Sequence, residues 1–184
     1  MNSIEDKLIP YFSKTEFPFE ILEEIRGLGV NGFHIKDFGG PGLNTMEVGA
    51  VLYEMAKVDC SISSFMTIHN SIGMAVIDYL GSEEQRARIL PDCISFKKIL
   101  AFGLTEPDFG SDASSLKTTA KKVEGGYVIN GEKRWIGNGT IADYIITWAR
   151  NVDDGNKIQA FLVEKGSQGL ITKKMENKYA LRPV

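Results

Sequence analysis

Histidine and cysteine are scarce in this chain of 184 residues, which contains only His34, His69, Cys60 and Cys93. Neither cysteine has a histidine close to it in the sequence, so the spacing predicts no zinc site. Two cysteines also do not provide the framework of a disulfide-stapled domain. We therefore expect no bound metal and no dependence on disulfides.

A strong excess of charge is absent too, since 21 Lys and Arg stand against 24 Asp and Glu, for a formal net charge of −3. This balance gives no reason to expect a nucleic-acid partner. No apolar run reaches the roughly 18 residues of a membrane span, and the N-terminal sequence MNSIEDKLIP lacks the basic-then-apolar order of a secretory signal. Together with 43% hydrophobic residues, these features predict a soluble, intracellular globular protein.

The first half of the chain carries the periodicity of helices. Apolar residues recur at 3.6-residue spacing between positions 44 and 58 (Val48, Val51, Leu52, Met55 and Ala56). A second apolar stripe predicts a buried helix over residues 65–80 (Ile68, Ile72, Ala75, Val76 and Tyr79). Capping-box patterns open two of the helices, formed by Asn44 with Glu47 and by Ser82 with Gln85.

Three glycines, Gly27, Gly29 and Gly32, spell the dinucleotide-binding pattern G-x-G-x-x-G. That motif functions only where it follows a strand and opens a helix. Here it follows a segment in which Phe19, Leu22 and Ile25 have helical spacing. We therefore predict that these glycines end a helix, where a left-handed cap is required.

Strand patterns replace helical ones from about residue 98. The segment 121–130 has the pattern of a hairpin with a turn at Gly125–Gly126, and 129–136 repeats it with a turn at Asn130–Gly131. Residues 143–150 and 157–165 read as two further strands. The expected fold class is α+β, with a helical bundle over residues 1–97 and an antiparallel, β-barrel-like domain over 98–184.

A polar loop, LTEPDFGSD at residues 104–112, follows the apolar run 99–104. Gly103 and Gly110 permit a ligand to approach the backbone closely. Thr105, Ser111 and the loop amides offer hydrogen bonds to carbonyl or phosphate oxygens. The alternative is a structural loop in which the Ser and Asp side chains make local turn bonds.

The string LTEPDFGSD resembles the FAD-binding signature of the acyl-CoA dehydrogenase and oxidase superfamily. A second flavin element of that superfamily, N-G-x-K-x-W-I, is similar to residues 130–136, and the segment 79–91 is similar to its G-S-E-E-Q-x-x-x-x-L-P segment. The resemblance runs from about residue 17 to the end. It is closest to the plant-type short-chain acyl-CoA oxidase and to glutaryl-CoA dehydrogenase.

This resemblance implies an enzyme that uses FAD to desaturate short-chain acyl-CoA thioesters between Cα and Cβ. Electrons would pass to O₂ or to an electron-transferring flavoprotein. The complete protein would be a homo-oligomer (a tetramer), peroxisomal or mitochondrial in a eukaryote and cytoplasmic in a bacterium. The family's C-terminal four-helix domain is expected to be absent from these 184 residues.

The resemblance also assigns site residues. It implies that the flavin ring contacts residues of both motifs (Phe102, Gly103, Leu104, Thr105, Gly110, Ser111, Trp135, Ile136 and Gly137). Thr105 and nearby amides would hydrogen-bond the pyrimidine edge of the ring, and Ser111 would touch the acyl-CoA. No catalytic residue is assigned in this chain, because the family's base lies beyond it, and the loop carboxylates Glu106 and Asp108 are expected to be structural.

Two departures from the family pattern carry further expectations. Gly137 stands where many dehydrogenases have threonine. This departure predicts either that there is room for O₂ beside the flavin or that glycine is needed at this position only for its backbone angle. Ser63 stands where glutaryl-CoA enzymes have an arginine, which predicts an uncharged acyl chain. A glutaryl-CoA dehydrogenase-type enzyme and a truncated, non-catalytic flavin-binding or assembly module are the alternatives.

Overall fold

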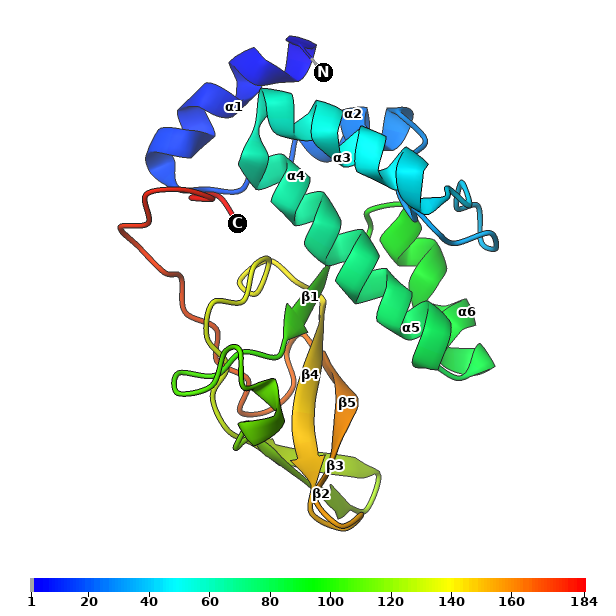
Figure 1. Cartoon of the computed structure of the whole chain (residues 1–184), viewed down its shortest axis with the longest axis vertical. Coiled ribbons are helices and arrows are strands. Elements are labelled where there is room, and N and C mark those ends of the chain that lie inside the picture. Colours follow the sequence, from blue (N-terminus) through cyan, green and yellow to red (C-terminus); the bar gives the residue numbers. More distant parts are fainter. Residues whose placement is uncertain (1) are drawn as a thin grey trace.

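The computed structural model describes residues 2–184, with helices in the first half of the chain and strands in the second (Figure 1). The helical elements are α1 (Asn2–Lys14), α2 (Ile21–Gly27), α3 (Thr45–Val58), α4 (Cys60–Met66), the π-helical η1 (Thr67–Met74), α5 (Ala75–Leu80) and α6 (Glu83–Ile94). The strands are β1 (Leu100–Gly103), β2 (Thr119–Val123), β3 (Gly126–Asn130), β4 (Tyr144–Asn151) and β5 (Lys157–Glu164), with a 3₁₀ turn η2 (Ala113–Ser115) after β1. The predicted α+β class, with its helical part first, is confirmed. The predicted domain boundary at 97/98 falls between α6 and β1.

One long helix, made of α4, η1 and α5, crosses the middle of the molecule (Figure 1). By length and composition it could cross a membrane, with a mean hydropathy of 1.2 over its best 18-residue window. It is not an uninterrupted apolar run, because serine, threonine, histidine and asparagine occur along it, and one such helix is weak evidence for a span. Half of that window is buried inside the protein, and the buried part includes the polar residues His69 and Asn70. A core helix of a folded protein has this character.

The buried face of this helix differs from the predicted stripe. Tyr79 is exposed and Ile72 is partly exposed. Buried residues instead recur at every fourth position (Phe65, His69, Gly73 and Ile77, with Met66, Asn70 and Met74 beside them). The predicted Ile68, Ile72 and Val76 have the same four-residue spacing one position away, so periodicity alone does not distinguish the two stripes. The buried stripe is the one that faces β1, through His69 and Gly73 against Leu100.

Strand β1 packs directly against η1. A Cβ atom on Gly73 would lie 2.9 Å from the Cβ of Leu100, so only glycine permits this approach. The buried His69 ring accepts a hydrogen bond at Nδ1 from the Leu100 N–H (3.1 Å) and donates from Nε2 to the Cys93 carbonyl (3.0 Å). Asn138 donates to the Leu100 carbonyl at 3.2 Å. Both backbone polar groups of Leu100 are thus satisfied by side chains rather than by water.

The five strands form a mixed sheet, and the predicted antiparallel arrangement was wrong in this respect. β4 pairs in parallel with β1 (Leu100 opposite Tyr144) and with β2, whereas β2–β3 and β4–β5 are antiparallel. The rings of Tyr127 in β3 and Phe161 in β5 meet edge to face with centroids 4.9 Å apart. The β2–β3 hairpin therefore curls back over the sheet, which makes the sheet barrel-like.

Turn positions were only partly predicted. Val123 pairs with Gly126, so the β2–β3 turn consists of Glu124 and Gly125, not of Gly125 and Gly126. Gly125 supplies the left-handed backbone (φ +80°). The predicted hairpin at Asn130–Gly131 is not formed, because residues 131–143 contain no strand. The β4–β5 hairpin has the predicted position.

The predicted helix ends are confirmed. The glycine motif follows helix α2, and Gly29 and Gly32 have left-handed φ values of +66° and +87°, as caps require. Both predicted capping boxes are formed, at Asn44 and at Ser82. The dinucleotide-binding interpretation of the glycines is excluded, since the helix α2, and not a strand, leads into them.

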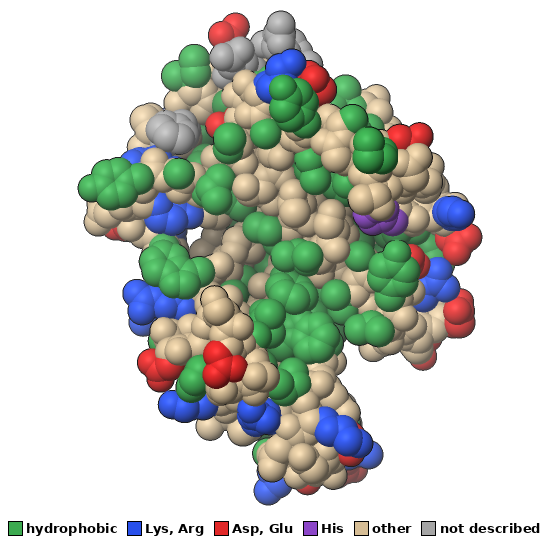
Figure 2. Space-filling model, in the orientation of Figure 1, with side chains coloured by type: hydrophobic (Ala, Val, Ile, Leu, Met, Phe, Trp, Pro, Cys, Tyr) green, Lys and Arg blue, Asp and Glu red, His purple; other side chains and the backbone are tan. Residues whose placement is uncertain are grey.

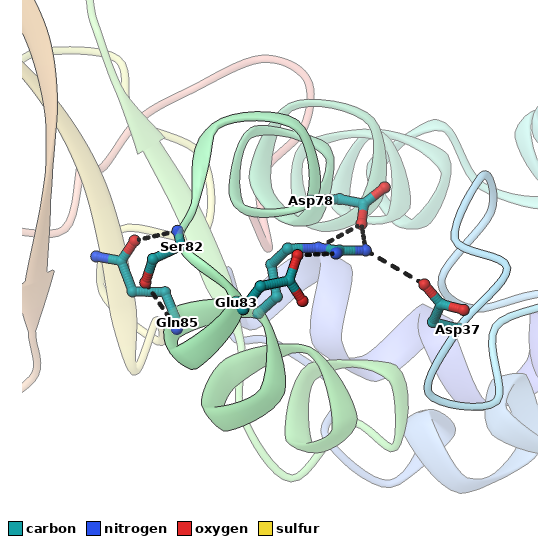
Figure 3. A network of polar contacts seen from close by, with 6 residues as sticks. Asp37, Asp78, Ser82, Glu83 and Gln85 are labelled. Carbon is teal, nitrogen blue, oxygen red and sulfur yellow. Dashed lines mark hydrogen bonds and ion pairs between the residues drawn. The ribbon is translucent and has the colours of Figure 1, made fainter.

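The turn between α5 and α6 is held by charged side chains (Figure 3). The guanidinium of Arg86 donates to Asp78 at 2.8 and 3.1 Å, to Glu83 at 3.1 Å and to Asp37 at 3.3 Å. Asp37 belongs to the loop before α3, so one arginine ties three segments of the helical part together. Arginine suits this role because its planar fork carries several donors.

Protonation of His69 is expected to destabilise the fold. Burial lowers the pKa of His69 to about 4, against 6.5 for an ordinary histidine. As the pH falls below 6.5 the unfolded chain takes up the proton first, so the stabilising contribution is complete above that value and is lost as the pH falls toward 4. We predict that the free energy of unfolding in urea falls by about 2 kcal/mol between pH 7 and pH 5.

The matched controls for this experiment are two glutamine variants. His69→Gln should be less stable at pH 7 and should show little pH dependence in that window. His34→Gln should retain the dependence, because it leaves His69 in place. A wild-type stability that is constant from pH 7 to pH 5 would contradict the buried neutral imidazole.

Candidate functional site

A large cleft of about 1940 Å³ lies between the helical part and the sheet. Its walls are formed by Ser64 and Ile68 of the long helix, by the loop 131–141, by β5 and by the C-terminal segment 167–184. Figure 1 shows this segment returning from the sheet to the end of α1. Seven basic side chains and only three acidic ones line the cleft, so its charge favours an anionic ligand.

The C-terminal segment contributes much of this positive charge through Lys173, Lys174, Lys178 and Arg182. Burial and then the neighbouring Lys174 lower the pKa of Lys178, because a second cation close by disfavours its charged form. Lys178 donates to the carbonyls of Leu181 and Val184, which folds the end of the chain back on itself.

The two predicted motif loops lie side by side, and the second of them lines the cleft. The Arg134 N–H donates to the Thr105 carbonyl at 2.8 Å. The ammonium of Lys133 donates to the Leu104 carbonyl and to Glu106 Oε1, both at 2.9 Å. Residues that are about 30 positions apart in the sequence thus meet through backbone and side-chain hydrogen bonds.

The carboxylate of Glu106 is the centre of these contacts. It accepts hydrogen bonds from the N–H groups of Lys117 (2.6 Å) and Thr118 (2.9 Å) as well as from Lys133. Burial by itself would raise the pKa of Glu106, but these donors outweigh it and lower the pKa to about 2. A carboxylate of such low basicity is a poor general base. This agrees with the prediction that Glu106 is structural.

The predicted site residues fall into two groups. Trp135, Ile136 and Gly137 line the cleft. Those of the first motif, Phe102 to Thr105 with Gly110 and Ser111, are not among the lining residues.

The first-motif residues take different places. Phe102 packs edge to face with Trp148, with ring centroids 6.1 Å apart, within the apolar cluster shared with α5 and α6. Figure 2 shows hydrophobic side chains gathered over this region of the sheet, below α5. Gly110 and Ser111 lie exposed in the loop beyond Thr105.

Trp135 has the most unusual conformation at the site. Its backbone is left-handed (φ +62°), which is rare for a bulky residue, and 62% of its surface is exposed. Arg134 lies 5.1 Å from the centre of its indole ring. An exposed aromatic ring in a strained backbone at the rim of a cleft is a feature of ligand sites.

The expectation of empty space beside Gly137 was wrong. A Cβ atom there would overlap the δ-methyl group of Ile68 and would lie 3.7 Å from Val184. Gly137 also lacks a positive φ, so an unusual backbone angle does not explain it either. The glycine instead makes room for Ile68, which reaches across from η1.

Several cleft residues were missed by sequence reasoning. Ser64, Ile68 and the basic C-terminal segment come from parts of the chain whose patterns indicated only helix or loop. Ser63, the position singled out for the acyl chain, does not face the cleft as Ser64 does, because its hydroxyl donates to the Leu52 carbonyl at 3.1 Å. Among the described residues 2–184, no group of three or more metal-ligating side chains is present.

Comparison with known families agrees with this geometry. The model described as "Acyl-CoA dehydrogenase, N-terminal domain" matches residues 2–97, and the one described as "Acyl-CoA dehydrogenase, middle domain" matches residues 101–184. The chain belongs to the acyl-CoA dehydrogenase family. The resemblance inferred from the motifs is thereby confirmed.

Individual relatives are similar over nearly all of this chain. An acyl-CoA dehydrogenase of Bacillus subtilis (strain 168) is 37% identical over 169 residues, covering 90% of this chain and 45% of its own length. A mitochondrial isobutyryl-CoA dehydrogenase of Dictyostelium discoideum is 36% identical over 181 residues, covering 95% and 43%. A glutaryl-CoA dehydrogenase from Mycobacterium smegmatis, solved in complex with FADH2, superposes with a TM-score of 0.90 at 33% identity, covering 98% and 47%. The chain spans less than half the length of these relatives.

The contact between Gly137 and Ile68 generates a prediction. Gly137→Ala adds only the Cβ atom that would overlap Ile68, and we expect it to cost about 1–3 kcal/mol of stability through overpacking. Ile68→Val deletes only the overlapping δ-methyl group. The double variant should therefore be more stable than Gly137→Ala alone in urea unfolding.

Gly110→Ala is the matched control, because nothing lies within 4 Å of a Cβ at that position. It should change stability by less than about 0.5 kcal/mol. Equal costs for Gly137→Ala with and without Ile68→Val would show that the two residues are not in contact.

Proposed function

We propose that the chain forms the helical and sheet portions of an FAD-dependent enzyme that desaturates short-chain acyl-CoA thioesters between Cα and Cβ. The observation that carries this proposal is the meeting of the two flavin-type motif loops, at Thr105–Arg134 and Leu104–Lys133, beside a large basic cleft with an exposed tryptophan. The relatives named above are acyl-CoA dehydrogenases, which supports the same reaction class.

The residues present fit FAD. A flavin ring needs an aromatic or apolar surface, which Trp135 and Ile136 offer at the cleft. A diphosphate needs cations, and basic side chains exceed acidic ones in the lining by seven to three. The FADH2 bound to the Mycobacterium smegmatis relative supports the same cofactor.

When bound, FAD supplies the acceptor for the hydride that leaves Cβ. The chain's own residues would orient and polarise the flavin ring. The Thr105 hydroxyl and the amides after Gly103 would hydrogen-bond the pyrimidine edge, and such donors favour negative charge on the ring. Ser111 would touch the acyl-CoA, although the loop that carries it lies outside the cleft lining in this structure.

Removal of the α-proton is not assigned to any residue of this chain. Glu106 is excluded as the base by its low pKa and its three hydrogen-bond donors. Asp108 is exposed and pairs with Lys117 at 3.5 Å. No base is therefore proposed from the first motif loop.

The acyl chain is proposed to be short and uncharged. The helix from Cys60 to Leu80, which forms one wall of the cleft, contains no Lys or Arg that could pair with a distal carboxylate. Burying an unpaired carboxylate there would be costly. The basic side chains of the cleft come instead from α6, the loop 131–141 and the C-terminal segment. An acyl chain that ends against this helix would therefore favour butyryl-CoA over glutaryl-CoA, despite the similarity to a glutaryl-CoA dehydrogenase.

An electron-transferring flavoprotein is the proposed electron acceptor. The steric reason for favouring O₂ is lost, because Ile68 fills the space beside Gly137. A homo-oligomer remains part of the proposal for the complete enzyme. Its compartment would be mitochondrial in a eukaryote or cytoplasmic in a bacterium, as the mitochondrial and bacterial relatives suggest.

FAD binding tests the proposal directly on the 184-residue chain. Trp148→Phe leaves Trp135 as the single tryptophan, and Trp148 Nε1 has no hydrogen-bond partner among the described residues that this change would remove. We predict that FAD quenches the Trp135 fluorescence in a saturable manner and that NAD⁺ does not. Equal quenching by both, or by neither, would contradict a flavin site.

Acyl selectivity is predicted for the full-length enzyme that contains this chain. Butyryl-CoA should be turned over with a kcat/KM at least about tenfold higher than glutaryl-CoA, because an unpaired distal carboxylate costs at least about 1.4 kcal/mol in the transition state. Steady-state assays with an artificial electron acceptor measure both substrates. A preference for glutaryl-CoA would rule out the uncharged pocket.

A further inference from the structure

We propose that Lys133 is a positioning residue, which together with Glu106 sets the spacing between the two loops that carry the flavin contacts. This inference rests on the proposed function, because it concerns FAD affinity. Lys133 does not itself need to touch the flavin. It acts through the Leu104–Glu106 segment on one side and the Arg134–Trp135 segment on the other.

Burial makes this ion pair unusual in the protein. The side chains of Lys133 and Glu106 are only 11% and 5% exposed, whereas at least one partner is much more exposed in nearly every other ion pair of the described residues. A buried pair is weak evidence for net stability, because desolvation offsets the attraction between the charges. Its better-attested use is to select one arrangement of the groups around it.

The geometry shows which arrangement is selected. Lys133 is joined at 2.9 Å to a carbonyl and to a carboxylate of the first loop. Its stem also crosses the end of β1, where its Cγ would lie at an ordinary contact distance of 3.5 Å from a Cβ on Gly103. Glu106 in turn closes the first loop on Lys117 and Thr118, directly before β2.

The consequence is a single connected unit. Among the described residues, the backbone hydrogen bond from Arg134 to Thr105 is the one other hydrogen bond between the two loops, and Gly131 packs directly on Thr118 where the loops meet the β2–β3 hairpin. Without the ammonium, that backbone bond would be the hydrogen bond left next to Trp135. The spacing of the predicted ring contacts therefore depends on Lys133.

The experiment separates positioning from stability with four variants in the Trp148→Phe background. Lys133→Met removes the ammonium and leaves Glu106 buried and unpaired. Glu106→Gln with Lys133→Met removes both charges and keeps one acceptor oxygen, which can serve the N–H of Lys117 or of Thr118 but not both. Lys133→Arg retains the charge, and Lys57→Met breaks the exposed pair with Glu54 (3.0 Å) as a control remote from the cleft.

We expect Lys133→Met to lower the melting temperature and to weaken FAD binding roughly 10- to 100-fold, the loss of one charged hydrogen-bonded contact. The double variant should regain part of the melting temperature, because no buried charge is left unpaired, but not the FAD affinity. Lys133→Arg should retain part of the affinity, and Lys57→Met should change neither quantity. Recovery of FAD affinity together with the melting temperature in the double variant would overturn the proposal.

Whether Lys133 and Glu106 hold the two loops together can also be measured without flavin, and therefore independently of the proposed function. In the FAD-free chain, amide hydrogen exchange reports the Arg134 N–H, which is bonded to Thr105. Its exchange should become at least tenfold faster in the double variant, while the β4–β5 amides stay unchanged. Unchanged protection of Arg134 would overturn the proposal, whereas failure of the wild-type chain to bind FAD would count against the proposed function alone.

Discussion

The hydrogen bond from the Leu100 N–H to the His69 ring is the contact on which the arrangement of this protein depends. It joins the first residue of the sheet to the centre of the longest helix, and Gly73 gives the strand room to lie there. The imidazole must be neutral to accept this bond at Nδ1 while donating at Nε2. This hydrogen bond fixes β1 on the helix, and β1 in turn fixes β4 through their parallel pairing. The cleft lies between that sheet and the helix.

Charged and polar side chains, more than apolar ones, decide how the loops around the cleft are placed. Asn138 holds the loop 131–143 against Leu100, and Glu106 holds the loop 104–118 against β2. Each is buried, so an alternative loop position would leave a polar group without a partner, which costs more than the bond itself contributes. Apolar packing sets where the sheet lies on the helices, but these polar contacts set which residues face the cleft.

Local sequence patterns predicted local structure well, whereas features that depend on contacts between distant residues could not be predicted from them. Both capping boxes and the glycine caps depend on residues within one turn, so the pattern alone identified them. The parallel pairing of β1 with β4 depends on partners far apart in the sequence, and strand propensity carries no information about direction. Tertiary packing decides which of the two stripes of the long helix is buried, and it also places Ile68 in the space at Gly137. The motif residues were found from resemblance, whereas the contacts of Lys133 with Leu104 and Glu106 required the structure.

The parallel pairing of β1 and β4 has a consequence for how the chain folds. The contact between Ile99 and Asp143, at the start of this pairing, closes a loop of 44 residues, and both motif loops lie inside it. Such a closure costs chain entropy before any ladder bond forms, so it is slow compared with helix formation. During synthesis the helices can form first, and β1 can then pack on η1 before β4 is available to pair with it. The cleft is therefore assembled late, after β4 has left the ribosome and paired with the docked strand, which stays at the edge of the sheet.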